Sequence, residues 1–297
     1  MSVLVDCRTR VCVMGVTGRI GRVQTRYMQA AGTQIVSGVT PGKGGEQVEG
    51  VPVYDTVTAA QAAAPADAVV LFVPPAAAET AASEAIAVGI GLVVLITEGV
   101  PVHGAMRLRA RARAAGARLL GPTTPGIITP GQCKIGIMPA ALFSPGPVGV
   151  ISRSGTLSYE VSGALGAAGI GQSTVIGMGA DPVVGTPLVD LIELFQADPQ
   201  TEAIVIIGEV GGDQEERAAE FLAGRPHKPV VAYIAGHSVP PGVRMGHAGA
   251  IVQRGGGTAA SKAAALAAAG IPTATGPAGV ADLVRKALRD RLQDTPC

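Results

Sequence analysis

Short segments rich in Val, Leu and Ile alternate with alanine-rich segments along most of the 297-residue chain, and Gly or Pro stands at the joins. The apolar segments are apolar throughout, as strands are when helices cover both faces of a parallel sheet. This order predicts an α/β fold that begins with a doubly wound, Rossmann-like sheet. The predicted strands of this first part are 11–15, 34–40, 68–73, 92–97 and 117–120, and its predicted helices are 18–31, 76–88 and 105–115.

A proline-rich segment, 123–147, separates the two predicted halves of the chain. Proline does not fit the interior of a long helix or a central strand, so this segment is expected to cross between domains. The predicted boundaries are 1–122 for the Rossmann-like domain, 123–147 for the crossing segment and 148–297 for a second α/β domain. The second domain is expected to resemble flavodoxin, with strands at 148–151, 173–176, 203–207 and 230–234 and helices at 155–167, 187–196, 215–223, 259–269 and 278–292.

The charge and patterning of the chain exclude several classes of protein. The 23 Lys and Arg residues nearly balance the 22 Asp and Glu residues, so the chain lacks the basic excess of a nucleic-acid-binding protein. No apolar run of about 18 residues is free of Gly, Pro and charge, and no membrane span is predicted. The N-terminus lacks the pattern of a secretion signal, which predicts a cytoplasmic location. The four cysteines have no metal-ligand spacing, so no metal site is predicted.

The first predicted strand runs directly into a glycine-rich turn, residues 15–21, that opens a helix. Three glycines at this spacing let backbone amides approach a pyrophosphate, and a helix N-terminus favours an anion. The pattern predicts a phosphate site at Thr17, Gly18, Arg19 and Ile20, although an ordinary tight turn can carry the same glycines.

The end of the second predicted strand indicates which kind of nucleotide could bind. An NAD site normally has Asp or Glu at this point to accept a hydrogen bond from the ribose. This chain instead has Lys43 between glycines, with no carboxylate. A lysine suits a phosphorylated ribose, as in CoA or NADP, and the alternative is a solvated loop lysine.

One of the four histidines, His247, lies in a segment of very small residues, Gly246 to Ala250. Small neighbours leave the imidazole open to a bulky phosphoryl group, and neutral imidazole is nucleophilic near pH 7. Glu209 follows the predicted strand 203–207, at the sheet edge where α/β sites form, and could fix the tautomer of the ring. From the pattern alone, His247 could equally be an exposed or structural residue.

The segment 152–156 joins a predicted strand to the following helix and carries hydroxyls and unpaired backbone amides. Ser154 lacks the G-x-S-x-G frame of a hydrolase nucleophile. Ser154 and Gly155 therefore predict a second anion site at a helix N-terminus.

Taken together, these features resemble the alpha-subunit family of the succinate–CoA ligases. The similar segments occur in order from near the N-terminus to about residue 270: GVTPGKGG at 38–45, GIITPGQCKIGIMP at 126–139, SRSGTLSYE at 152–160, DPQTEAIVIIGEVGG at 198–212 and RMGHAGAI at 244–251.

The resemblance implies an N-terminal CoA-binding domain and a C-terminal ligase domain that carries a phosphohistidine. In this family a phosphoryl group passes from a nucleoside triphosphate to the histidine and then to a carboxylate, from which CoA displaces it. The implied partner is a beta subunit that binds Mg-ATP or Mg-GTP, in a heterodimer or a heterotetramer, and the implied substrates are CoA and a dicarboxylate.

The resemblance also assigns roles to residues of this chain. His247 resembles the phosphorylated histidine and Glu209 its carboxylate partner. The other implied contacts are Thr17, Gly18, Arg19, Ile20 and Lys43 for the phosphates of CoA, Ile96, Thr97 and Glu98 for the strand end beside CoA, Tyr159 for the substrate, and Ser154 and Gly155 for the histidyl phosphate.

One departure from the family bears on the identity of the acid substrate. The family usually shows Asn-Cys in the segment GPNCPG, whereas this chain has Thr123-Thr124. A malate–CoA ligase or another dicarboxylate–CoA ligase is therefore an alternative. An NADP-dependent oxidoreductase would explain only the first domain, and a non-catalytic CoA- or nucleotide-sensing module would leave His247 unexplained.

Overall fold

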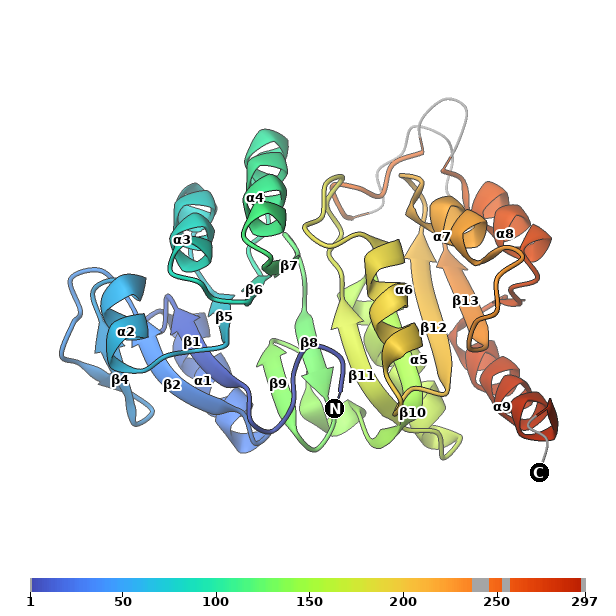
Figure 1. The fold of residues 1–297 in the computed structure, drawn as a ribbon, viewed down its shortest axis with the longest axis horizontal. Helices are drawn as coiled ribbons and strands as arrows, with labels where there is room; N and C mark the ends of the chain where they lie inside the picture. Colours follow the sequence, from blue (N-terminus) through green and yellow to red (C-terminus); the bar gives the residue numbers. More distant parts are fainter. Residues whose placement is uncertain (1, 237–245, 253–256, 295–297) are drawn as a thin grey trace. The chain divides into compact units, whose positions relative to one another are not determined.

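The computed structural model describes residues 2–236, 246–252 and 257–294 (Figure 1). The chain divides into two compact units. The N-terminal unit comprises residues 4–140 and 183–186, and the C-terminal unit comprises the described residues of 1–3, 141–182 and 187–297. The boundary at 140/141 falls inside the predicted crossing segment. His237, Arg244 and Met245 lie outside the described residues.

The N-terminal unit is built on a sheet with strand order β3-β4-β2-β1-β5-β6-β7. All neighbouring strands are parallel except the short pair β3 and β4. Helices α2, α3 and α4 pack along one face, and α1 packs on the other. The strands are β1 Arg10–Met14, β2 Gln34–Val39, β3 Gln47–Val48, β4 Val51–Tyr54, β5 Ala68–Leu71, β6 Leu92–Leu95 and β7 Arg118–Leu120, and the helices are α1 Arg19–Ala30, α2 Val57–Ala63, α3 Pro75–Ala87 and α4 Val102–Ala114.

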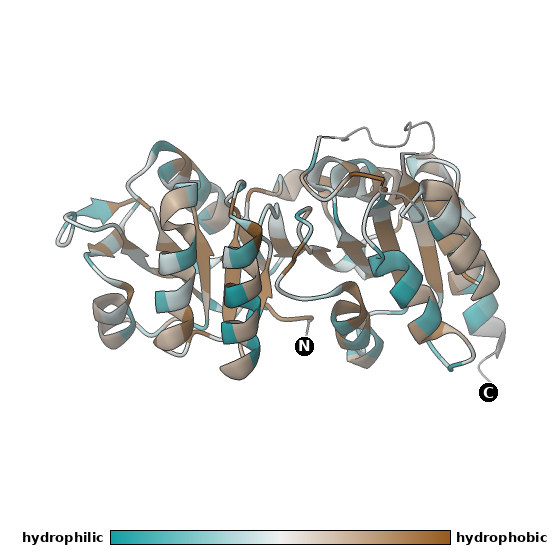
Figure 2. Cartoon of the chain, turned by 90° about the horizontal axis from the view of Figure 1, so that it is seen from above, coloured by the Kyte–Doolittle hydropathy of each residue, from teal (hydrophilic) through white to brown (hydrophobic). Residues whose placement is uncertain are grey.

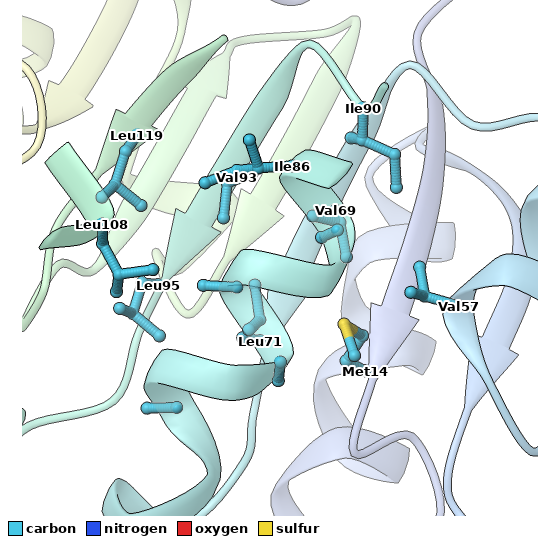
Figure 3. Close-up of a cluster of buried hydrophobic side chains, with 14 of the residues drawn as sticks. Met14, Val57, Val69, Leu71, Ile86, Ile90, Val93, Leu95, Leu108 and Leu119 are labelled. Carbon is cyan, nitrogen blue, oxygen red and sulfur yellow. The ribbon is translucent and has the colours of Figure 1, made fainter. Parts of the chain in front are cut away.

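The core of this unit explains why its strands read as apolar throughout. Every residue of β5 and β6 is buried. Val69, Leu71, Val93 and Leu95 point from these strands towards the apolar sides of α3 and α4 (Figure 3). Both faces of the central strands are thus covered, which confirms the predicted Rossmann-like arrangement.

The segment 123–147, predicted as a crossing segment without a central strand, contains a buried β-hairpin. Its strands are β8 Gly126–Thr129 and β9 Cys133–Gly136, which pair antiparallel and are fully buried. Pro125 and Pro130 flank β8 and do not interrupt it. A Cβ atom on Gly126 would lie 1.9 Å from the carbonyl oxygen of Ile135, so only glycine permits this close pairing.

The C-terminal unit holds five parallel strands in the order β14-β13-β12-β10-β11. Numbered along the chain, the order is 2-1-3-4-5 from the β11 side, which is the flavodoxin order and confirms the prediction. Helices α5 and α9 pack on one face, and α6, α7 and α8 on the other. The strands are β10 Pro145–Ser152, β11 Gln172–Gly177, β12 Ala203–Glu209, β13 Val230–Ala235 and β14 Thr273–Ala274, and the helices are η1 Ala140–Leu142, α5 Gly155–Ala167, α6 Leu188–Ala197, α7 Gln214–Leu222, α8 Ala259–Ala268 and α9 Pro277–Asp294.

The distribution of hydropathy follows these layers. In each unit the strands are predominantly hydrophobic, and hydrophilic residues gather on the outward sides of the helices (Figure 2). None of the described helices is long and apolar enough to cross a membrane.

The N-terminal unit contains a buried lysine. Lys134 of β9 is 2% exposed. Its Nζ lies 3.4 Å from the amide oxygen of Gln24 and 5.5 Å from the centre of the Tyr27 ring, neither of which carries a negative charge. Burial lowers the pKa of Lys134 from 10.5 to about 8, because water stabilises an ammonium group better than this core does.

We expect Lys134→Met to raise the free energy of unfolding by about 1–2 kcal/mol at pH 7, because a buried ammonium is replaced by a side chain of similar length. The parent chain should become more stable as pH rises from about 8 to 10.5, since over that range the unfolded state holds the proton that the folded state has lost. Urea titrations at pH 7 and pH 10 measure both effects. Lys286→Met, on the exposed side of α9, is the control, and an equal gain there would contradict this explanation.

Candidate functional site

The glycine-rich turn after β1 has the geometry of an anion-binding loop. Gly15 has a φ of +78°, and a Cβ atom on Gly21 would lie 2.2 Å from the carbonyl oxygen of Gly15. The turn can therefore fold tightly against the first turn of α1 only with glycine at both positions. The N-cap residue Gly18 offers no side chain to the amides of α1, and the first turn contains no acidic residue. Those amides are thus available to a phosphate group.

The predicted phosphate residues lie on two loops that contact each other. The hydroxyls of Thr17 and Thr40 are 3.2 Å apart, which joins the turn after β1 to the loop after β2. Gly18, Arg19 and Ile20 are exposed at the start of α1. Lys43, in the loop after β2, forms an ion pair with Glu46 at 3.0 Å and remains about half exposed. A charged ligand could compete with such a surface pair at little cost.

The loops after β5, β6 and β7 form a hydrogen-bonded series at the same edge of the sheet. The hydroxyl of Thr97 donates to the carbonyl of Val73 at 2.8 Å, and the backbone N–H of Thr123 donates to the carbonyl of Thr97 at 3.1 Å. Ile96 and Glu98 flank Thr97, and Glu98 is exposed. The predicted CoA-binding residues after β6 therefore adjoin the unusual Thr123-Thr124 pair.

Thr123 and Thr124 play different structural parts. Thr124 is buried, and its Oγ1 accepts a hydrogen bond from the backbone N–H of Gly126 at 2.9 Å. Thr123 has a φ of +56°, in the left-handed region. A β-branched residue is seldom found there, whereas Asn is several-fold enriched. Thr123 is thus a strained residue beside a predicted ligand site.

We expect Thr123→Asn to stabilise the N-terminal unit by about 1 kcal/mol, because asparagine adopts a positive φ at lower cost than threonine. The midpoint of thermal unfolding should rise by about 2–4 °C. Thr58→Asn, at an exposed position of α2, is the matched control and should give no gain. A lower midpoint for Thr123→Asn would show that contacts of the threonine side chain outweigh the strain.

The structure brings His247 and Glu209 together from segments 38 residues apart. Nδ1 of His247 lies 3.0 Å from Oε2 of Glu209. The histidine side chain is 32% exposed and the glutamate side chain 8%. A carboxylate can only accept, so Nδ1 carries the proton in this contact and Nε2 carries the lone pair of the neutral ring. The pair is suited to nucleophilic chemistry at Nε2.

Glycines allow the loop of His247 to lie close against the end of β12. Gly211 has a φ of +88°, and a Cβ atom there would lie 2.2 Å from the carbonyl oxygen of Gly249. The backbone N–H of Gly249 donates to the carbonyl of Ala180 at 3.0 Å. The loop is therefore fixed on two sides by backbone contacts that larger residues would block.

Ser154 and Gly155 lie at the same carboxyl edge of the C-terminal sheet, where α5 begins. Oγ of Ser154 caps the helix by accepting from the N–H of Leu157 at 3.4 Å, so the hydroxyl already has a structural role. Gly155 lies in the first turn, which has no acidic residue. Tyr159, in the next turn, stacks edge-to-face on Phe143 with ring centres 6.2 Å apart, and burial raises its pKa.

Sequence reasoning overlooked three buried charged residues near the histidine–glutamate pair. Arg153 and Glu215 contact Glu209, and Lys262 contacts Glu215. Arg153 was visible only as part of the segment 152–156. Glu215 and Lys262 pair across 47 residues, and no local pattern in the sequence connects them. Among the described residues, no group of three or more His, Cys, Asp and Glu side chains could hold a metal ion.

Family models cover most of the chain. A model described as CoA binding domain matches residues 6–99, and one described as CoA-ligase matches residues 151–271. These ranges contain the glycine-rich turn and the His247–Glu209 pair, respectively.

Three relatives align with nearly the whole chain. The chain is 51% identical to the ADP-forming succinate–CoA ligase subunit alpha 2 of Archaeoglobus fulgidus, over 97% of this chain and 100% of that protein. It is 49% identical to the corresponding alpha subunit of Methanothermobacter thermautotrophicus, over 97% and 98% of the two chains. It is 48% identical to the corresponding alpha subunit of Aquifex aeolicus, over 97% and 95%.

A solved structure shares the fold. ATP citrate lyase from Methanothrix soehngenii, in complex with citrate and coenzyme A, superposes with a TM-score of 0.88 at 27% identity. The match covers 99% of this chain but 53% of that one, so this chain spans about half the length of the lyase.

Proposed function

The chain belongs to the family of succinate–CoA ligase alpha subunits, which are acid–thiol ligases, and from this we propose that it forms succinyl-CoA reversibly from succinate, CoA and ATP. We propose ATP as the nucleotide because the three relatives are ADP-forming. Alpha subunits act with a beta subunit, and we assign the Mg-nucleotide site to that subunit. A heterodimer or heterotetramer and a cytoplasmic location remain predictions.

The main support for the proposed mechanism is the 3.0 Å contact between His247 and Glu209. Glu209 accepts a hydrogen bond from Nδ1–H, so the lone pair of Nε2 can attack the γ-phosphorus of ATP. A phosphorus–nitrogen bond forms as the phosphorus–oxygen bond to ADP breaks. The carboxylate of succinate then attacks the same phosphorus and releases the imidazole. The thiolate of CoA finally attacks the acyl carbon and expels phosphate.

We assign the CoA-binding site to the N-terminal unit. The CoA-binding family model covers the turn after β1, where the amides at the start of α1 are unoccupied by acidic side chains. We assign Thr17, Gly18, Arg19 and Ile20 to the phosphates of CoA. Lys43 and the residues Ile96, Thr97 and Glu98 complete this proposed site, whereas Tyr159, Ser154 and Gly155 are assigned to the acid and the histidyl phosphate.

The Thr123-Thr124 pair is the observation that favours an acid other than succinate as a second candidate substrate. Thr123 and Thr124 occupy the place of the family's usual Asn-Cys, and the hydroxyl of Thr124 is held by the N–H of Gly126. Malate, itaconate and citrate are the alternatives to succinate for this ligase.

The test is to mix the chain with its beta subunit and ATP labelled in the γ-phosphoryl group. We expect label that is stable in base and lost in acid, as a phosphoramidate is, and that maps to the peptide containing His247. Addition of CoA with succinate, malate, itaconate or citrate should release the label with the true acid. Absence of label would favour a CoA- or nucleotide-sensing module or an oxidoreductase over a ligase.

A further inference from the structure

A buried arginine contacts both Glu209 and the loop that carries His247. Arg153 follows β10, and its side chain is 6% exposed. Nη1 donates to the carbonyl of Gly211 at 2.7 Å and to the carbonyl of Glu209 at 3.1 Å, and Nη2 donates to the carbonyl of Gly249 at 3.5 Å. One guanidinium group therefore holds both the end of β12 and the loop that carries His247.

The same guanidinium forms an ion pair with the carboxylate of Glu209. Nη2 of Arg153 lies 3.7 Å from Oε1 of Glu209, the oxygen that does not face the histidine. Among the described residues, Oε1 has no hydrogen-bond donor. A carboxylate buried this deeply needs a nearby positive charge to remain ionised at moderate cost. Arg153 thus stabilises the carboxylate of Glu209, which accepts a hydrogen bond from Nδ1–H of His247.

Arg153 forms a second ion pair, with Glu215. Glu215, which is fully buried, accepts from Nη1 of Arg153 at 3.4 Å and from the backbone N–H of Glu209 at 3.2 Å. Its other oxygen pairs with the fully buried Lys262, which also donates to the carbonyl of Gly212 at 3.2 Å. Lys262 also pairs with Glu216 at 3.1 Å, so Arg153 and Lys262 together face three carboxylates. A guanidinium with planar, directed donors can hold this many partners at once, whereas an ammonium group is less suited to it.

The fit of these groups depends on glycine. A Cβ atom on Gly249 would lie 3.2 Å from Nη2 of Arg153, and one on Gly208 would lie 2.4 Å from Oε1 of Glu215. The backbone of β12 thus approaches Glu215 at a distance that excludes a side chain at Gly208, and a side chain at Gly249 would press on the guanidinium. Such close contact limits how far Glu209 and His247 can move relative to each other.

From these contacts we propose that Arg153, supported by Glu215 and Lys262, is a positioning residue for phosphoryl transfer. It fixes the carboxylate of Glu209 against Nδ1 and so selects the ring tautomer in which Nε2 is the nucleophile. Its effect on rate rests on the proposed function, whereas its effect on the tautomer does not. A displacement of about 1 Å at a reacting group can cost about 100-fold in rate.

The kinetic test compares Arg153→Met and Arg153→Lys in the complex with the beta subunit. We expect the single-turnover rate of phosphorylation by ATP to fall about 100-fold in Arg153→Met and about 10-fold in Arg153→Lys, which keeps the charge but not the planar donors. The KM for CoA should stay unchanged, because that site lies in the other unit. Arg217→Met, which removes an exposed arginine of α7 paired with Asp213 at 3.8 Å, is the matched control.

The spectroscopic test determines which ring nitrogen of His247 carries the proton. In the same complexes, with 15N-labelled histidine, the ring nitrogens of His247 are assigned by their absence from His247→Ala. We expect Nδ1 to be protonated in the parent protein and both tautomers to be populated in the Arg153 variants. If Arg153→Met does not fold, Arg153→Lys decides by the same two measurements.

The outcomes separate this inference from the proposed function. Parent rates and a parent ring spectrum in a folded Arg153 variant would overturn the positioning role while leaving the ligase intact. A parent protein that takes up no phosphoryl group would overturn the proposed function, and the ring spectrum would then decide the positioning role alone. A changed spectrum with slower transfer, and no change in Arg217→Met, would establish both.

Discussion

A chain carrying His247→Ala is expected to take up no phosphoryl group from ATP under conditions that label the parent chain fully. Alanine offers no nucleophile, and the loss of a nucleophile in covalent catalysis removes the intermediate itself. The expected effect is therefore complete loss of label and of succinyl-CoA formation, with CoA binding retained in the N-terminal unit. Filter binding of labelled protein and isothermal titration with CoA measure the two quantities.

Two other histidines serve as matched controls for this change. His103 lies in the first turn of α4, and His227 lies in an exposed loop where its Nδ1 is 2.7 Å from the carbonyl of Lys228. His103→Ala and His227→Ala should both take up label at the parent rate. Label that persists in His247→Ala, or that disappears in His227→Ala alone, would place the phosphoryl group elsewhere.

The sequence was sufficient to predict the larger elements because their patterns are local. The helix predicted at 155–167 coincides with α5, and the helix predicted at 76–88 differs by one residue at each end from α3. Apolar strands such as β5 and β6 were recognisable because both of their faces are buried. Strand order in the C-terminal unit followed from the alternation of strands and helices.

The smaller elements could not be predicted, for physical reasons. Helix α2 has seven residues, and strands β3 and β14 have two each, so no hydrophobic period can develop in them. The hairpin of β8 and β9 was obscured by the prolines at its ends, which read as chain breaks.

The candidate site was only partly visible in the sequence. The small residues around His247 and the acid after β12 drew attention to the pair, but the distance between them depends on the fold. Arg153 could not be identified from local pattern, because its partners Glu209, Gly211 and Gly249 lie 56, 58 and 96 residues away. The order of the strands in the sheet brings such residues together, and no pattern in the neighbouring sequence indicates the contact.

Glu209→Gln is expected to slow phosphorylation of His247 by about 10³–10⁴-fold. Glutamine has the same shape, but its amide group can donate as well as accept. With the amide nitrogen facing Nδ1, the ring is held in the tautomer that places the proton on Nε2, and the nucleophilic lone pair is lost. In a serine-protease triad, exchanging the orienting carboxylate for an amide costs about 10⁴-fold in kcat for this reason.

Rapid-quench measurement of label transfer from ATP, in the complex with the beta subunit, gives the rate for Glu209→Gln. Glu220→Gln, on the exposed side of α7, carries the same chemical change away from the site and should transfer label at the parent rate. The tautomer explanation also requires Glu209→Asp to retain more activity than Glu209→Gln, because a shorter carboxylate can still only accept. If the aspartate variant were the slower of the two, the length of the side chain would matter more than its charge. The 3.0 Å contact would then position the ring without selecting its tautomer.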